Sequence, residues 1–199
     1  MTSKPIALIL ALVLAAPFAA EAQQAVKIVR IGYLALNLAA APHLTEAFRQ
    51  GLRDLGYVEG RNLVIEYRSA EGKPEQFPAL AAELVALKVD VIVTPGTPQA
   101  LAAKQATKTL PIVFAAVADP VTSGLVTSLA RPGGNITGLS LLFPELVGKC
   151  LEHLKQAVPG TTRVAVLSQP GAVPERTDKD IRKEADLAAR ALGVKASIR

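Results

Sequence analysis

The sequence predicts an α/β protein built on a doubly wound parallel sheet, with helices covering both faces of that sheet. Short runs of β-branched and apolar residues alternate with segments whose apolar residues recur every three or four positions, which is the spacing of one helix face. Several of the runs lack alternating polar residues, as expected of strands that are buried on both sides. Half of the residues are apolar, which excludes a disordered chain.

Five strands are predicted before residue 141, with helical segments between them. The strands are residues 26–34, 63–67, 89–93, 111–114 and 135–140. The helical segments are the stripe of Leu44, Phe48, Leu52 and Leu55, the stripe of Phe77, Leu80, Leu84 and Leu87, a short helix over residues 98–107, and the stripe of Val121, Leu125 and Leu129. The crossover rule makes the connections between parallel strands right-handed.

The alternation of helix and strand restarts after Ser140. The predicted elements are a helix with Leu146, Cys150, Leu154 and Val158 inward, a strand at 163–167, a helix with Ile181, Ala185, Ala188 and Leu192 inward, and a strand at 194–198. Two strands and two helices cannot cover both faces of a sheet. We therefore expect residues 23–140 to form a complete first lobe and residues 141–199 to form part of a second lobe.

Residues 1–22 are expected to be a cleaved secretory signal peptide. Lys4 supplies the positive start, residues 6–16 are an uninterrupted apolar run of 11, and Ala20-Glu21-Ala22 has the small-x-small pattern of a cleavage site. A membrane anchor needs roughly 20 apolar residues, so this run is too short to span a bilayer. We therefore expect an exported, soluble protein of the periplasm.

Residue counts exclude several classes of protein. One cysteine cannot form a disulfide within the chain, and one cysteine with two histidines cannot complete a zinc site without carboxylates, so no metal or cofactor is expected. The net charge of +5 comes from scattered basic residues with no interleaved aromatic side chains, which argues against a nucleic-acid partner. No G-x-G-x-x-G or G-x-S-x-G motif is present, so no catalytic residue is assigned. Cys150 is expected to be a buried hydrophobe rather than a nucleophile.

Three loops follow predicted strands at the edge of the sheet where open α/β folds bind ligands. The first holds residues 37–43. In the second, residues 94–98, the free N–H groups of a helix start attract an anion such as a carboxylate, and Thr97 either contacts the ligand or caps the helix. In the third, residues 118–120, Asp119 either pairs with a ligand ammonium or caps the next helix, and spacing alone favours the cap.

Several motifs, taken together and in order, resemble those of one family. They are residues 47–62 (AFRQGLRDLGYVEGRN), residues 65–68 (IEYR), Asp90-Val-Ile-Val, Gly96-Thr97, Pro111-Ile-Val-Phe, Asp119-Pro-Val and Arg131-Pro-Gly-Gly-Asn-Ile-Thr-Gly138. The sequence resembles the ABC-transporter substrate-binding proteins, of the kind that includes tryptophan and tyrosine binders. The resemblance covers nearly all of residues 28–168.

This resemblance implies a type I periplasmic binding protein, in which two hinged α/β lobes close on a small solute, such as an amino acid, and deliver it to an ABC permease in the membrane. It also implies a monomer that is not an enzyme, a first hinge crossing at residues 140–144, and ligand contacts at Asn37, Thr97 and Asp119. Two such lobes total roughly 250 to 300 residues, so we expect a C-terminally truncated chain. The alternatives are an extracytoplasmic α/β enzyme and a ligand sensor for a membrane receptor.

Overall fold

The computed structural model describes residues 28–198, so the predicted signal peptide at residues 1–22 lies outside the described residues. The main feature is a five-stranded sheet in the order β2-β1-β3-β4-β5, in which every neighbouring pair of strands is parallel. The strands are β1 (Val29–Ala35), β2 (Leu63–Ser69), β3 (Val91–Thr94), β4 (Ile112–Val117) and β5 (Ile136–Ser140). The predicted parallel α/β fold is confirmed.

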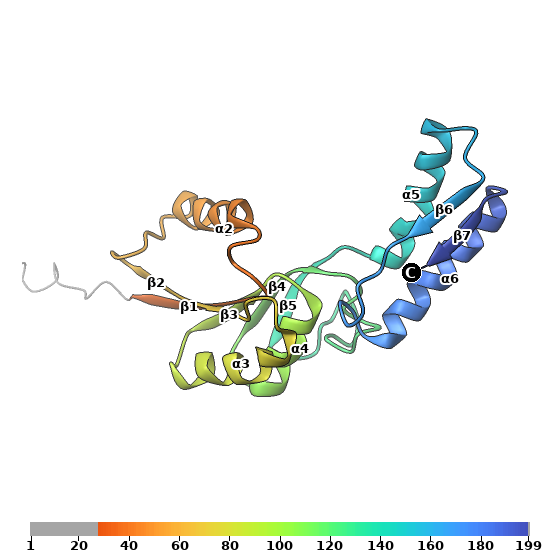
Figure 1. The fold of residues 1–199 in the computed structure, drawn as a ribbon. Helices are drawn as coiled ribbons and strands as arrows, with labels where there is room; N and C mark the ends of the chain where they lie inside the picture. The colour runs from red at the N-terminus through yellow and green to blue at the C-terminus, as the bar shows by residue number, and fades with distance from the viewer. Residues whose placement is uncertain (1–27, 199) are drawn as a thin grey trace, which may run out of the picture.

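Helices cover both faces of this sheet (Figure 1). α2 (Pro42–Asp54) lies on one face, and α3 (Phe77–Ala86), which follows the short helix η3 (Pro74–Gln76), lies with α4 (Thr97–Ala106) on the other. Two neighbouring residues of β1 show how the faces are filled. Tyr33 packs against Phe48 of α2, with ring centroids 5.2 Å apart, whereas Leu34 belongs to the buried cluster that contains Leu84 of α3. Because successive side chains of a strand point to opposite faces, one strand contributes to both cores.

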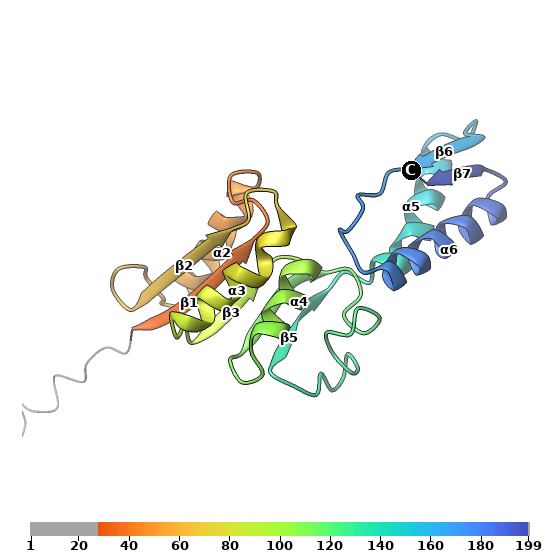
Figure 2. The ribbon, with the colours of Figure 1, turned by 60° about the horizontal axis from the view of Figure 1, so that its bottom comes forward.

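The residues beyond β5 form a second sheet of two strands with two helices. The elements are α5 (Phe143–Ala157), β6 (Arg163–Val166), α6 (Glu175–Ala191) and β7 (Lys195–Ile198), and β6 pairs with β7 in parallel. Val147 and Leu151 of α5 form a buried cluster with Ile181 and Ala185 of α6. Figure 2 shows these elements beyond the β5 side of the larger sheet. Among the residues that the structure describes, no helix is both long and apolar enough to cross a membrane.

The helix predicted over residues 121–129 is absent, and turns take its place. The Asp119 carboxylate accepts hydrogen bonds from two successive backbone N–H groups, at 3.0 and 2.9 Å, and so starts a turn. Gly124 then adopts a left-handed φ of 74°, and the N–H of Leu125 bonds back to the carbonyl of Pro120 at 2.9 Å. This is the geometry that ends a helix. The apolar spacing was therefore misleading, because Leu125 is buried by a turn rather than by a helix face.

The predicted inward faces of two helices are partly wrong. In α5 the buried residues include Val147 and Leu151, one position after the predicted stripe, because α6 covers that side. Cys150 is an exposed free thiol and not a buried hydrophobe. The sequence could not decide between the two stripes, since both recur at helical spacing. The residues of the predicted α2 and α5 stripes that the structure exposes are Leu44, Leu55, Leu146, Leu154 and Val158, and Val121 and Leu129 of the absent helix are exposed as well.

The last residues of the 131–138 motif hold β5 beside β4. The side-chain amide of Asn135 donates to the carbonyl of Leu110 at 2.7 Å, which fixes the start of β5 next to the start of β4. Gly138 lies so close to Phe114 of β4 that an added Cβ would stand 2.0 Å from the Phe114 carbonyl oxygen. No other residue permits this approach of the two backbones without a shift of the strands.

We predict that Gly138→Ala destabilises the protein by about 3 kcal/mol or more, at the upper end of the cost of overpacking. Urea denaturation followed by circular dichroism measures this change. Gly134→Ala is the matched control, because nothing lies within 4 Å of a Cβ at that glycine. The control should change stability by less than about 1 kcal/mol. Equally small effects of the two substitutions would contradict the close approach of β4 and β5.

Candidate functional site

A cavity of about 340 Å³ lies at the carboxyl edge of the five-stranded sheet. One side is formed by Leu36 after β1, residues 96–99 at the start of α4, and Ala118 after β4. The other side is formed by Phe143 at the start of α5 and by residues 169–173 in the loop between β6 and α6. The cavity therefore lies between the larger sheet and the elements that follow it, at the edge where parallel α/β sheets bind ligands.

A smaller cavity of about 110 Å³ adjoins the larger one. Leu36 and Gln99 line both cavities, and Tyr33 and Thr45 line the smaller one. Burial raises the pKa of the Tyr33 phenol above its usual range, and a hydrogen bond with Thr45 partly offsets this shift. The phenol is therefore neutral near pH 7, and the smaller cavity has a polar but uncharged wall.

Thr97 lies at the larger cavity and is almost completely buried, with 4% of its surface exposed. Its hydroxyl accepts a hydrogen bond from the N–H of Ala118 at 3.4 Å. The cap interpretation of Thr97 is wrong, because the residue that precedes the helix is Gly96 and no side chain caps this end. Thr97 instead connects the first turn of α4 to the end of β4.

The start of α4 presents to the cavity backbone donors that have no partner in residues 28–198. The first N–H groups of any helix have no partner within that helix. Pro98 has no N–H, which leaves those of Thr97 and Gln99 in the first turn, while the N–H of Ala100 bonds to the carbonyl of Gly96 at 3.1 Å. Such donors, together with the helix dipole, attract an anionic or acceptor group of a ligand.

Gln99 is the residue of this site that sequence reasoning missed. It is 6% exposed, and its Oε1 is buried without a hydrogen-bond partner among the described residues. The side chain folds back over Gly96, where a Cβ would stand 2.8 Å from Oε1. Glutamine at the third position of a helix is a signal for a capping box, and this signal could have drawn attention to Gln99. The capping bond itself is not made.

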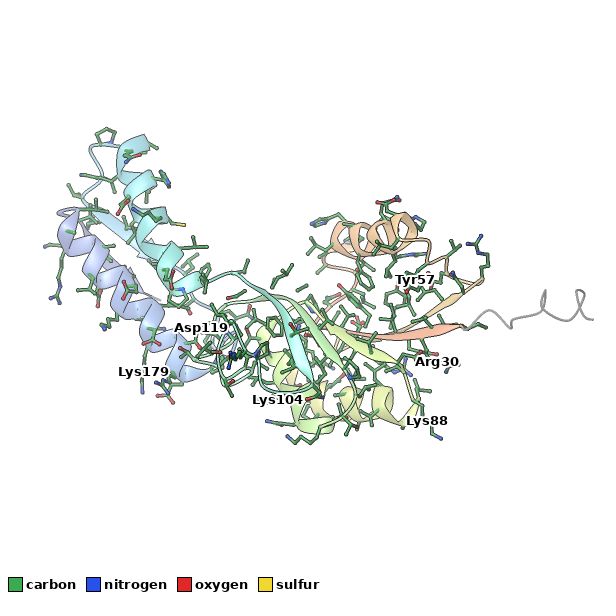
Figure 3. All side chains as sticks on the ribbon, turned by 180° about the vertical axis from the view of Figure 1, so that it is seen from behind. Arg30, Tyr57, Lys88, Lys104, Asp119 and Lys179 are labelled. Atoms are coloured by element: carbon green, nitrogen blue, oxygen red, sulfur yellow. The ribbon has the colours of Figure 1, made fainter. Side chains whose placement is uncertain are left out.

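Asp119 does not line either cavity. Its Oδ1 accepts hydrogen bonds from the N–H groups of Val121 and Thr122, at 3.0 and 2.9 Å, so this oxygen organises the turn after β4. Figure 3 labels Asp119 among the loops between the larger sheet and helices α5 and α6. Lys104, labelled in the same figure, stabilises this turn, because its ammonium donates to the carbonyls of Gly124 and Leu125 at 2.6 and 3.1 Å.

Asn37 lines the smaller cavity and not the larger one. Its Oδ1 accepts hydrogen bonds from the N–H groups of Ala39 and Ala40, at 3.0 and 3.3 Å, which shapes the loop after β1. The structure thus places Thr97 at the larger cavity, Asn37 at the adjoining one and Asp119 outside both. The three predicted contacts lie at one edge of the sheet but do not converge on one point.

The walls of both cavities carry no charged side chain among the residues that the structure describes. The described residues also include no group of three or more His, Cys, Asp or Glu side chains placed to hold a metal ion. What the site offers a ligand is therefore apolar contact, the backbone donors of α4 and neutral polar side chains.

Comparison with known proteins identifies the family. The family model described as ABC transporter substrate binding protein matches residues 38–195. The tyrosine-binding protein of Clostridioides difficile (strain R20291) is 36% identical over 147 residues, which is 72% of this chain and 42% of that protein. A solved conserved domain protein from Vibrio cholerae O1 biovar El Tor is 34% identical, with a TM-score of 0.78 over 87% of this chain. The ABC domain from Streptococcus pneumonia, solved in complex with L-Trp, is 26% identical, with a TM-score of 0.76 over 87% of this chain.

The solved structures and the parallel sheet with helices on both faces show a type I periplasmic binding protein fold. The chain spans 42% of the length of the curated relative and 57% of each of the two solved structures. The family match covers most of the chain, and the relative at 36% identity supports it independently. The chain therefore belongs to the ABC transporter substrate-binding protein family.

Proposed function

We propose that this protein is the solute-binding component of an ABC import system and holds a small solute, an amino acid or a similar molecule, between two lobes. The observation that carries the proposal is the larger cavity, whose walls come from the start of α4 on one side and from residues 169–173 on the other. The similar proteins support the class of solute, since one is named a tyrosine-binding protein and one was solved with L-Trp. Residues 1–22 would direct export to the periplasm, where an ABC permease is the partner of a monomeric binding protein.

The proposed lobes are residues 23–140 and 141–199, and residues 140–144 cross between them. This crossing is attached to the end of β4, because the N–H of Leu141 bonds to the carbonyl of Val117 at 2.8 Å and that of Phe143 to the carbonyl of Ala118 at 2.9 Å. Leu142 lies in the left-handed region, with a φ of 48°, which is costly for a residue other than glycine. A backbone held in this way between two sheets is suited to act as a hinge.

Each proposed ligand contact binds a different part of the solute. The backbone N–H groups at the start of α4, with Thr97, hold the carboxylate of the solute. Asn37 contacts the part of the solute that enters the smaller cavity, which it lines. Asp119 lines neither cavity in this structure, so it would pair with the ammonium when the two lobes close on the solute, through Oδ2, the carboxylate oxygen that accepts neither of the two turn hydrogen bonds.

The proposed function is tested by a thermal-shift screen of the chain from Gln23 with L-tyrosine, L-tryptophan and L-leucine. A ligand present at 100 times its dissociation constant stabilises a protein by about 2.7 kcal/mol, which raises the melting temperature measurably. We expect at least one of these amino acids to raise it, and to be recovered unchanged. Conversion of the solute would favour the enzyme alternative, and a folded protein that responds to none of them would contradict amino-acid binding. Uptake of the bound solute by cells with and without the gene then tests import.

A substitution at Asp119 separates its structural role from ligand binding. Asp119→Asn keeps an oxygen that accepts both turn hydrogen bonds but removes the charge. The melting temperature of the unliganded protein should therefore stay the same, while the dissociation constant of the amino acid should rise about tenfold. Asp119→Ala also removes the turn acceptor and should cost about 1 kcal/mol of stability. Calorimetric titration measures both affinities. Unchanged affinity of Asp119→Asn would show that Asp119 supports the turn and does not contact the ammonium.

A further inference from the structure

The buried amide oxygen of Gln99 has no partner within the part of the chain that the structure describes. A buried acceptor without a hydrogen bond destabilises the folded state, so native proteins seldom retain one without a reason. Five buried side-chain atoms share this condition in the described residues, and the other four are hydroxyl oxygens. Gln99 is the residue among these five that lines the two cavities.

The local geometry holds this oxygen in place without giving it a hydrogen-bond donor. Gln99 is the third residue of α4, the position from which a glutamine usually bonds back to the N–H of the residue that caps the helix. Here the amide lies against Gly96, and the missing side chain of that glycine gives Oε1 the room it occupies. A larger residue at position 96 would displace the amide.

The surroundings of Gln99 determine which group of a ligand can donate a hydrogen bond to its Oε1. The unused N–H groups at the start of α4 favour a ligand acceptor such as a carboxylate. Gln99 Oε1 lies in the same helical turn and needs a ligand donor. Among the described residues that line the two cavities, Gln99 carries the buried side-chain acceptor without a hydrogen-bond partner, so a donor on the solute would satisfy it. A ligand that satisfies both requirements carries a donor next to a carboxylate, as an α-amino acid does.

We propose that Gln99 determines specificity by accepting a hydrogen bond from the α-ammonium group, so that the site prefers α-amino acids to the same acids without the amino group. This inference rests on the proposed function, since it assigns the solute class of the same site. A site that is built around a polar ligand group rejects an analogue without that group, because its own buried polar atom is then left unpaired.

The test measures the affinities of L-tyrosine and 3-(4-hydroxyphenyl)propanoate, and of L-tryptophan and 3-(indol-3-yl)propanoate, by calorimetric titration. The wild type should bind at least one amino acid about tenfold or more tightly than its des-amino partner. Gln99→Met has a similar length but no amide acceptor, and it should reduce this preference at least about threefold while its affinity for the des-amino acid stays the same. Any preference that remains is due to Asp119, the other proposed partner of the ammonium. Gln105→Met makes the same change at an exposed position of α4 and should keep the preference.

The outcomes separate this inference from the proposed function. If the wild type binds none of L-tyrosine, L-tryptophan and L-leucine, the proposed function fails and the inference with it. If the wild type shows no preference for the amino acid, or if Gln99→Met retains that preference in full, the inference alone is wrong. The melting temperature of the unliganded protein gives a second readout. Gln99→Met should not lower it more than Gln105→Met does, because the substitution removes an unpaired buried acceptor, and a larger decrease would show that the amide has a structural role instead.

Discussion

The backbone of Ala118 connects the parts of the molecule that enclose the cavity. Its N–H donates to the hydroxyl of Thr97 in the first turn of α4, and its carbonyl accepts from the N–H of Phe143 in the segment that leaves the larger sheet. One residue at the end of β4 therefore determines where α4 begins and where the chain crosses to the second sheet. The close contact of Gly138 with Phe114 keeps β5, from which this crossing starts, beside β4. A ligand bound at the start of α4 thus touches the same short segment that positions the crossing.

The chemistry of the site follows from what its walls contain. Without charged side chains among the described lining residues, it depends on the backbone N–H groups of α4, on neutral polar side chains and on apolar area. Donors fixed at a helix start need no rearrangement to meet an acceptor, and the low polarity of the surroundings strengthens each hydrogen bond. The unpaired oxygen of Gln99 adds a requirement for a donor. We therefore assign affinity to the backbone N–H groups of the first turn of α4 and selectivity to the side-chain oxygen of Gln99 in the same turn.

The sequence was sufficient to predict the parallel α/β fold, because buried strands and helix stripes leave strong periodic signals. The prediction failed where two different structures are compatible with the same spacing of apolar residues. In α5 the stripes of Leu146 and of Val147 have the same spacing, and packing on α6 decides between them. In residues 121–129 the spacing of Leu125 suggested a helix that Asp119 and Gly124 limit to a turn. Thr97 and Asn37 were predicted near the edge where the cavities lie, but the buried state of Gln99 depends on packing that no local pattern encodes.

The central claim is that a solute binds at the start of α4, between the two sheets. Its most direct test is a titration of the ¹⁵N-labelled chain from Gln23 with L-tyrosine, followed through the backbone amide signals. The signals of Thr97, Gln99, Ala118 and Gly171 should shift together and saturate, while those of Leu63 and Val91, at the amino ends of β2 and β3, should stay in place. Shifts confined to that opposite edge, or none at millimolar L-tyrosine, would contradict the account.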